Sequence, residues 1–460
     1  MFSSLKKISL LTLSAFTLFS AANAQKTKSL FDGKTLNGWK IVAGDAPYAV
    51  ENGMIVGTMK AGTPNSFLIT EKEYGDFILE LDVKLEGTET NSGVQTRSHF
   101  DAAANNGKGK VFGRQMEIDP TPRAWTGGIY DEARRLWLYP LETNPAAKAA
   151  YKTEEFNHYK IECIGNEMKT WVNGVPASYV IDTLDQSGFI GLQVHGLGGK
   201  NYLEGKKVYF KNINIQTENL KPAAFPKSVY VVNLTPNTLS AQEKANGYKL
   251  LFDGKTNNGW LGAYKNTFPA KGWDISDGRL SVLPSDGGES TNGGDIVSKE
   301  EFTAFDLSFE FKLTEGANSG VKYFVTLSEK NTGSAIGLEY QVLDDEKHPD
   351  AKMGAVGNRT LGSLYDLIPS YKPDKRFQRK IGDWNQGRII VYPNNIVQHW
   401  LNGFKVVEYE RGSNIFKALV ARSKYAKYDG FGMGKTGNIL LQDHGDNVSF
   451  RNLKIRTIEK

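Results

Sequence analysis

The chain repeats itself once, and this duplication constrains its fold more than any other feature. The segment LFDGKTLNGW begins at Leu30, and LFDGKTNNGW begins at Leu251. Further pairs follow in the same order, among them FILELDVKL with FDLSFEFKL, NSGV with NSGV, WVNG with WLNG, and GLQVHG with LLQDHG. Self-similarity of this kind indicates a duplicated structural unit. We therefore expect two domains of the same fold.

The spacing of the matched segments sets the expected domain boundaries. The offset grows from 221 residues at the first motif (251 minus 30) to 249 at the histidine near the end (444 minus 195). The second copy therefore carries the longer loops. We expect domains over residues 25–218 and 248–460. The linker over residues 219–247 holds three prolines and a SAQEKANG segment that favours one short helical turn.

Strand patterns dominate both copies. Runs such as FILELDVKL, HYKIECIG and RIIVYP alternate apolar and polar residues with the period of a half-buried strand. The Asn-Gly pairs in WVNG and WLNG predict tight hairpin turns. Helical periodicity is scarce. The predicted fold class is therefore all-β, with two tandem antiparallel β-sandwich domains of the jelly-roll type.

The N-terminus predicts export. Two lysines, an apolar run and Ala22-Asn23-Ala24 form the pattern of a cleaved signal peptide over residues 1–24, so a periplasmic or secreted location is expected. No later stretch is apolar for long enough to span a membrane. Removing two lysines lowers the net charge from +5 to +3, which is too small to indicate a nucleic-acid partner. The single cysteine, Cys163, excludes an intramolecular disulfide.

Polar residues share one face of several predicted strands in each copy. Side chains two residues apart point to the same side of a strand. Gln115 therefore shares a face with Glu117, as Glu339 does with Gln341, and the carboxylate and the amide have exchanged places between the copies. Arg97 in the first copy and Lys322 in the second provide a cation from different positions of the preceding strand.

An imidazole, a carboxylate and a cation on one surface can supply a base, an acid and an electrostatic stabiliser. The predicted catalytic residues are His195, Glu117, Arg97, His444, Glu339 and Lys322. The predicted substrate-binding residues are Asn91, Gln115, Tyr130, Asp131, Gln193, Asn318, Gln341, Tyr365, Asp366 and Gln442.

Metal binding is weakly indicated. The sequence contains neither a paired-histidine motif such as HExxH nor a cysteine cluster. The acidic stretch DDEKHPD lacks the spacing of known calcium loops. No cofactor is assigned, and whether the protein binds a divalent metal stays an open question. The sequence does not specify an oligomeric state.

Taken in order, the motifs resemble the 3-keto-disaccharide hydrolase family. The resemblance rests on LFDGKT-x-NGW, NSGV, the G-x-[IL]-YD loop, W-[VL]-NG and LQ-x-HG, and it covers nearly the whole mature chain twice. It implies a concanavalin A-like sandwich and a carbohydrate substrate oxidised at C3. The copies differ where Phe324 occupies the position of Arg97 and where Val194 replaces the acidic Asp443. Either change could mark one copy as altered or inactive.

A ketone at C3 acidifies the proton on C2, so the substrate implied by the resemblance invites a specific reaction. A base removes that proton, the C1 substituent leaves by β-elimination, and added water completes net hydrolysis. His195 and His444 are the expected bases or acids, Glu117 and Glu339 their carboxylate partners, and Arg97 and Lys322 the stabilisers.

Two alternatives stay open. Each copy could be a non-catalytic carbohydrate-binding sandwich, or one domain could catalyse while the other binds. An ordinary glycosidase with two carboxylates fits less well, because each copy shows one strongly placed glutamate with a histidine.

Overall fold

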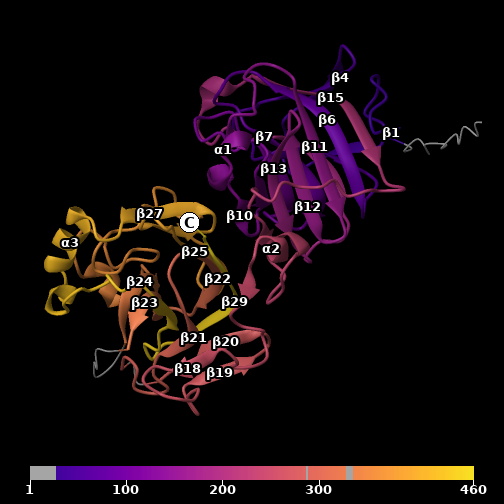
Figure 1. Cartoon of the computed structure of the whole chain (residues 1–460). Helices are drawn as coiled ribbons and strands as arrows, with labels where there is room; N and C mark the ends of the chain where they lie inside the picture. The colour runs from indigo at the N-terminus through magenta and orange to yellow at the C-terminus, as the bar shows by residue number, and fades with distance from the viewer. Residues whose placement is uncertain (1–26, 286–287, 328–334, 460) are drawn as a thin grey trace, which may run out of the picture.

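The computed structural model describes residues 27–285, 288–327 and 335–459, which form two β-sandwich domains joined by a packed connector (Figure 1). The predicted all-β class is confirmed, because antiparallel sheets make up both domains. The predicted signal peptide over residues 1–24 lies outside the described residues. Within the described ranges, the helices are all too short or too polar to cross a membrane.

The first domain packs a larger sheet against a smaller one. The larger sheet has the order β16-β13-β12-β11-β6-β15-β4-β3 with β1 beside β15, and the smaller has the order β10-β9-β8-β7-β14-β5-β2. The strands and helices of this domain are β1 (Lys28–Ser29), β2 (Trp39–Val42), β3 (Tyr48–Glu51), β4 (Met54–Thr58), β5 (Ser66–Thr70), β6 (Phe77–Leu85), β7 (Ser92–Asp101), β8 (Lys110–Ile118), β9 (Ile129–Glu132), β10 (Leu136–Tyr139), η1 (Leu141–Thr143), α1 (Pro145–Lys148), β11 (Asn157–Ile164), β12 (Glu167–Val172), β13 (Val175–Ile181), β14 (Phe189–Val194), η2 (Asn201–Leu203) and β15 (Lys207–Gln216).

The second domain repeats this plan. Its sheets have the orders β19-β20-β29-β22-β25-β26-β27, with β17 beside β29, and β18-β21-β28-β23-β24. The connector and the second domain contain β16 (Val232–Asn233), α2 (Ala241–Ala245), β17 (Lys249–Leu250), β18 (Trp260–Gly262), β19 (Trp273–Ser276), β20 (Arg279–Val282), β21 (Ile296–Phe302), β22 (Phe305–Leu313), β23 (Asn318–Thr326), β24 (Ile336–Leu343), η3 (Pro349–Lys352), η4 (Lys375–Phe377), β25 (Asn385–Val391), β26 (Ile396–Leu401), β27 (Phe404–Glu410), α3 (Asn414–Ala421), η5 (Lys424–Lys427), β28 (Gly437–Leu441) and β29 (Val448–Thr457).

Both predicted hairpins are present, and their turns explain the Asn-Gly pairs. Asn173 and Gly174 join β12 to β13 with φ of 50° and 80°, and Asn402 and Gly403 join β26 to β27 with 49° and 84°. Positive φ at two successive positions matches the right-handed twist of the strands, and Asn and Gly tolerate it at low cost.

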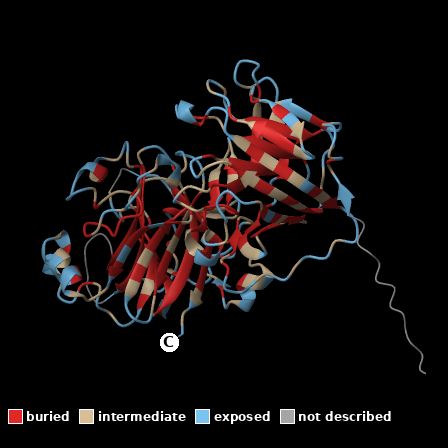
Figure 2. Cartoon of the chain, turned by 90° about the horizontal axis from the view of Figure 1, so that it is seen from above, coloured by how far each residue is buried: buried red, intermediate tan, exposed pale blue. Residues whose placement is uncertain are grey.

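The interior is continuous across the two domains. Figure 2 shows buried strands through the middle of the molecule, with most exposed positions in the loops around them. One hydrophobic cluster includes Met116 and Trp125 of the first domain together with Phe309 and Phe404 of the second. Trp125 and Phe404 have ring centroids 5.4 Å apart. Burial of apolar surface therefore stabilises the contact between the domains as well as each sandwich.

The connector is bound to both domains. β16 pairs in parallel with β13 of the first domain. The predicted helical turn is α2, which begins with a capping box between Ser240 and Glu243. Glu243 is buried and pairs with Lys454 of β29 at 2.9 Å. These contacts hold the two sandwiches in one arrangement.

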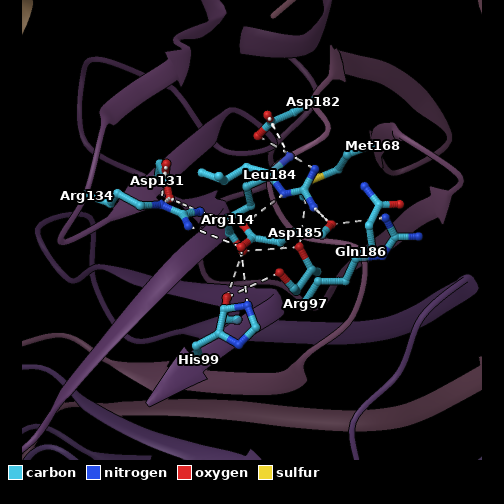
Figure 3. A network of polar contacts seen from close by, with 12 residues as sticks. Arg97, His99, Arg114, Asp131, Arg134, Met168, Asp182, Leu184, Asp185 and Gln186 are labelled. Atoms are coloured by element: carbon cyan, nitrogen blue, oxygen red, sulfur yellow. Dashed lines mark hydrogen bonds and ion pairs between the residues drawn. The ribbon is translucent and has the colours of Figure 1, made fainter. Parts of the chain in front are cut away.

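A buried ion-pair network lies on the inner side of the smaller sheet in the first domain (Figure 3). Asp185 accepts hydrogen bonds from Arg134 at 2.5 and 3.1 Å, and its backbone carbonyl accepts one from Arg114 at 2.6 Å. Burial alone would raise the pKa of Asp185, but the bonds and charge of Arg134 outweigh it and hold that pKa below its ordinary value. Asp185 is therefore ionised and compensates the buried Arg114 and the partly buried Arg134.

We expect Asp185→Asn to lower the free energy of unfolding by about 3 kcal/mol, because it leaves buried guanidinium charge without its partner. Urea unfolding at pH 7 measures this change. The matched control is Asp45→Asn, which alters an exposed carboxylate and should change stability by less than about 0.5 kcal/mol. Equal stability of the two variants would show that the network contributes little.

Candidate functional site

In the first domain, a carboxyl group held by amides lies at the centre of the outer face of the smaller sheet. Glu117 on β8 accepts hydrogen bonds from Asn91 Nδ2 at 2.7 Å and from Gln115 Nε2 at 2.9 Å. Gln95 on β7 donates to Gln115 Oε1 at 2.7 Å. The structure thus brings together the residues that alternation placed on one face.

The neighbouring glycine on β7 makes room for this group. Gly93 pairs with Glu117, and a Cβ at Gly93 would lie 2.3 Å from Gln115 Cδ. In the second domain a Cβ at Gly320 would lie 2.4 Å from Glu339 Oε1. Each copy therefore needs a glycine at this position of the strand, because the side chain of Gln115 or Glu339 on the neighbouring strand extends over it.

Two acids of the first domain have strongly raised pKa values. Burial raises the pKa of Glu117 to about 7, although the hydrogen bonds from Asn91 and Gln115 oppose the shift. Burial raises the pKa of Glu132 to about 7 as well, and the nearby charge of Glu117 adds to this effect. Groups with such values can give or take a proton near neutral pH.

His195 directly follows β14, which neighbours β7 in the smaller sheet. Its Nδ1 lies 2.6 Å from the Gly196 carbonyl oxygen, which only accepts, so Nδ1 carries the proton and Nε2 keeps a lone pair. Burial lowers the pKa of His195, which keeps the ring neutral. Asp119 and Arg123 act electrostatically on both His195 and Glu117. The neutral imidazole can therefore serve as a base.

Arg97 does not join this group, and its predicted position is wrong. A bulge after Thr96 interrupts the alternation of β7, and Arg97 has a φ of 46°. Its guanidinium donates to the carbonyls of Gly75 and Gly165 at 2.7 Å each and pairs with Asp76 at 2.7 Å. Arg97 is thus part of the buried network in Figure 3 and lies away from Glu117.

Asp131 also lies elsewhere. Asp131 on β9 lies opposite Arg114 on β8 in the strand register. Its side chain therefore points to the other side of the sheet from those of Tyr130 and Gln115. Arg134 and Arg135 both bind it. Tyr130 alone of the predicted Tyr-Asp pair faces Glu117, and burial raises its pKa. The expected role of Asp131 in substrate binding is therefore replaced by an ion-pairing role.

In the second domain, a buried lysine faces the carboxyl group across two strands. Lys322 on β23 pairs with Glu339 on β24, and its Nζ lies 3.8 Å from Asp295 Oδ2. Burial raises the pKa of Glu339 to about 7, although the charge of Lys322 opposes the shift. Burial likewise raises the pKa of Asp295 to about 6. Lys322, Glu339 and Asp295 therefore interact electrostatically, and all three side chains are buried.

A cavity of about 170 Å³ opens over this pair. Its lining includes Lys322, Glu339, Glu289, Lys424 and Tyr425. The cavity is polar, and a pocket with a few convergent polar groups is the usual form of a small-ligand site.

Amide atoms without protein partners recur at matching positions of the two copies. Asn91 Oδ1 and Asn318 Oδ1 are buried, and neither has a hydrogen-bond partner among the described residues. The same holds for both polar atoms of Gln193 and for Oε1 of Gln442, whose Nε2 donates to Glu289 at 2.9 Å. Buried polar groups are nearly always paired. These atoms therefore keep hydrogen-bonding capacity that a ligand hydroxyl group or an ordered water could satisfy.

The other predicted residues of the second domain have partners within the protein. Gln341 Oε1 accepts from the Val342 backbone N at 3.1 Å. Tyr365 Oη donates to Asp350 at 2.8 Å, and Glu339 is among the charges that raise its pKa after burial. Asp366 accepts from Arg359 and from a backbone N–H, which are structural contacts.

His444 lies with His348 and Asp446 beyond the end of β28. One donor atom from each of the three lies within 4.8 Å of the others, so they are the described residues closest to a metal-binding arrangement. His348 Nδ1, however, accepts the Asp350 backbone N–H at 3.2 Å, which puts the proton of a neutral ring on Nε2. A metal at this cluster would require that bond to break. The structure therefore gives His444 neighbours different from those of His195.

Several residues of the two sites were not predicted. Glu132 follows Tyr130 by two positions, so the same alternation could have identified it. Asp295 and Glu289 come from a Gly-rich loop, and Lys424 and Tyr425 come from the segment around η5. No periodic pattern marks such loop residues.

Comparison with known proteins agrees with the duplication. The model of the 3-keto-alpha-glucoside-1,2-lyase-like domain matches residues 26–216 and residues 247–456, which confirms two copies. A 3-keto-disaccharide hydrolase from Bacteroides thetaiotaomicron is 34% identical over 265 residues, covering 53% of this chain and 89% of that protein.

Two solved structures are similar to parts of this chain. A crystal structure of a candidate glycosyl hydrolase from Parabacteroides distasonis has 30% identity and a TM-score of 0.42, covering 49% of this chain and 100% of that one. The carbohydrate-binding module CBM66 from Bacillus subtilis has 16% identity and a TM-score of 0.25, covering 39% of this chain and 95% of that one.

The raised pKa values predict that stability falls with pH. Between about pH 4.5 and 7 the folded protein keeps protons on Glu117, Glu132 and Glu339 that the unfolded chain releases. The free energy of unfolding therefore decreases as pH rises through this window. We expect Glu132→Gln to be more stable than the parent by about 2 kcal/mol at pH 8, because solvent screens part of the charge of this partly exposed carboxyl group, and equally stable at pH 4.

Urea unfolding at pH 4, 6 and 8 measures this difference. Glu71→Gln, at an exposed position, is the control and should leave the pH dependence unchanged. A constant difference between Glu132→Gln and the parent at all three values would contradict the raised pKa.

Proposed function

Because the chain belongs to the 3-keto-alpha-glucoside-1,2-lyase-like family in both of its halves, we propose that it cleaves glycosides oxidised at C3 by elimination across C1 and C2. The family and the named relative make it a carbohydrate-active protein similar to 3-keto-disaccharide hydrolases. One observation carries the mechanism: Glu339, a buried carboxyl with a pKa of about 7, faces the buried Lys322 in a polar cavity.

Glu339 is the proposed base of the second site. The C3 ketone acidifies the C2 proton, and a carboxyl group with a pKa near 7 is half ionised at neutral pH, so it can accept that proton. Its burial also excludes water, which strengthens the interaction with a bound substrate.

Lys322 is the proposed stabiliser. Deprotonation at C2 places negative charge on the C3 oxygen, and an ammonium group in a buried site favours that charge. The C1–O bond then breaks, the departing oxygen takes up the proton that Glu339 accepted, and a double bond forms between C1 and C2. Water added across that bond completes net hydrolysis. Asn318 and Gln442 would orient sugar hydroxyls through their unpartnered oxygens.

The first site differs in a way that favours a division of labour. In the first domain Gln95 lies opposite Gln115 on the neighbouring strand. These two positions correspond to Lys322 and Glu339 in the second domain. The first domain offers Glu117 and His195 as acid and base, with an amide in place of the lysine. This exchange supports the alternative that the first domain binds or slowly turns over the sugar while the second catalyses. We place the protein in the periplasm or outside the cell on the basis of residues 1–24.

We expect the protein to release the aglycone from a 4-nitrophenyl 3-keto-α-glucoside and not from the unoxidised glucoside. In a chain whose first site is silenced by Glu117→Gln, Lys322→Met should lower kcat/KM at least about 100-fold, because it removes the charge that stabilises the enolate. Absorbance of released nitrophenolate gives the rate.

Lys435→Met, at an exposed position, is the matched control and should leave the rate unchanged. Cleavage of the unoxidised glucoside, or full activity of Lys322→Met, would contradict the mechanism. Binding of the keto compound without turnover would instead favour a carbohydrate-binding protein. Assays with and without chelator report whether a metal takes part.

A further inference from the structure

Among the described residues of the first domain, no cation pairs with Glu117 across the strands as Lys322 pairs with Glu339. Arg97 points into the buried network, and Gln95 occupies the position of the lysine. Arg123 is nearby, but it pairs with Asp119 at 2.6 Å, and its guanidinium lies 4.6 Å from the ring centroid of Trp125. Asp119 and Trp125 thus hold the guanidinium of Arg123.

A loop of the second domain reaches this site. Residues 369–384 include η4, which contacts β10 at the edge of the smaller sheet that faces the second domain (Figure 1). Phe377 stacks on Phe404 with ring centroids 3.6 Å apart, and Phe404 lies against Trp125 of the first domain. Arg379 Nη2 lies 3.5 Å from the Trp137 carbonyl oxygen. The aromatic contacts fix the loop against the first domain.

Arg376 is the residue of this loop whose charge acts on the first site. Its electrostatic partners include Tyr130 and Glu117, and it also acts on His195. Its Nε and Nη2 donate to Asp374 at 2.9 and 2.5 Å. Its Nη1 makes no hydrogen bond within the described ranges, and 45% of the side chain is exposed.

We propose that Arg376 of the second domain binds the substrate in the first domain's site, so that this site is complete only in the two-domain chain. Its ligand is the C3 oxygen of the oxidised sugar, as ketone or as enolate, which a guanidinium N–H can bind. The inference rests on the proposed function, because it takes the same substrate class.

The fixed arrangement of the domains makes such a shared site feasible. A Cβ at Gly403 would lie 2.7 Å from Pro140, so the β26–β27 turn touches the first domain directly. The connector is bound on both sides by β16 and by the Glu243–Lys454 pair. Positioning a charge within a fraction of an ångström requires rigid support of this kind.

The test uses the full chain with its second site silenced by Lys322→Met and Glu339→Gln. In this background, Arg376→Gln should lower kcat/KM for the 4-nitrophenyl 3-keto-α-glucoside at least tenfold, and Arg376→Lys should restore part of the loss. Calorimetry measures binding of the same compound in parallel. The melting temperature should stay within about 2 °C of the background, because the side chain is half exposed.

Arg422→Gln replaces an exposed arginine of the same domain and should change neither binding nor rate. Weaker binding in Arg376→Gln without any turnover in the background would support the shared site while contradicting catalysis by the first domain. Unchanged binding and rate in Arg376→Gln would overturn the inference and leave the proposed function intact. If the background protein neither binds nor cleaves the compound, that result contradicts both the shared site and the proposed function of the first domain.

Discussion

Burial of a carboxyl group against a β-sheet is the constraint on which both sites depend. A carboxylate taken out of water is costly unless it is hydrogen-bonded or protonated. The first domain meets this requirement with the amides of Asn91 and Gln115, and the second with the ammonium of Lys322. In each case burial prevails and leaves a pKa of about 7. The desolvation that makes burial of the carboxylate unfavourable thus also raises its pKa into the range where it can exchange protons at neutral pH.

The two copies solve the same problem with different chemistry. Glu117 pairs with Gly93, whereas Glu339 pairs with Lys322, one pleat further along the same pair of strands. Moving the acid by two residues keeps it on the same face, so the sandwich is undisturbed while the neighbours of the carboxyl group change. The bulge that turns Arg97 inward recurs at Phe324, which has a φ of 51°. The backbone has therefore been kept while the side chains have diverged.

The sequence predicted the fold well and the sites in part. Duplication, alternation and Asn-Gly turns are local or repetitive signals, and they identified the sandwiches, both hairpins and the shared face of Gln115 and Glu117. The predicted position of Arg97 was wrong because a single bulge reverses the face of every following side chain. No residue type in the sequence indicates where such a bulge occurs. Asp131 was misplaced because the alternation that put Tyr130 in the site puts its neighbour on the other side. Arg376 could not be found, since only the contact between domains brings it near Glu117.

The continuous hydrophobic interior has an evolutionary consequence. Duplication ordinarily frees one copy to accumulate changes while the other maintains the ancestral task. Here Trp125 and Phe404 belong to one cluster, so a substitution that loosens one half also weakens its sister. Selection for a folded chain must therefore act on the pair as a unit, even where the polar residues of the two sites diverge.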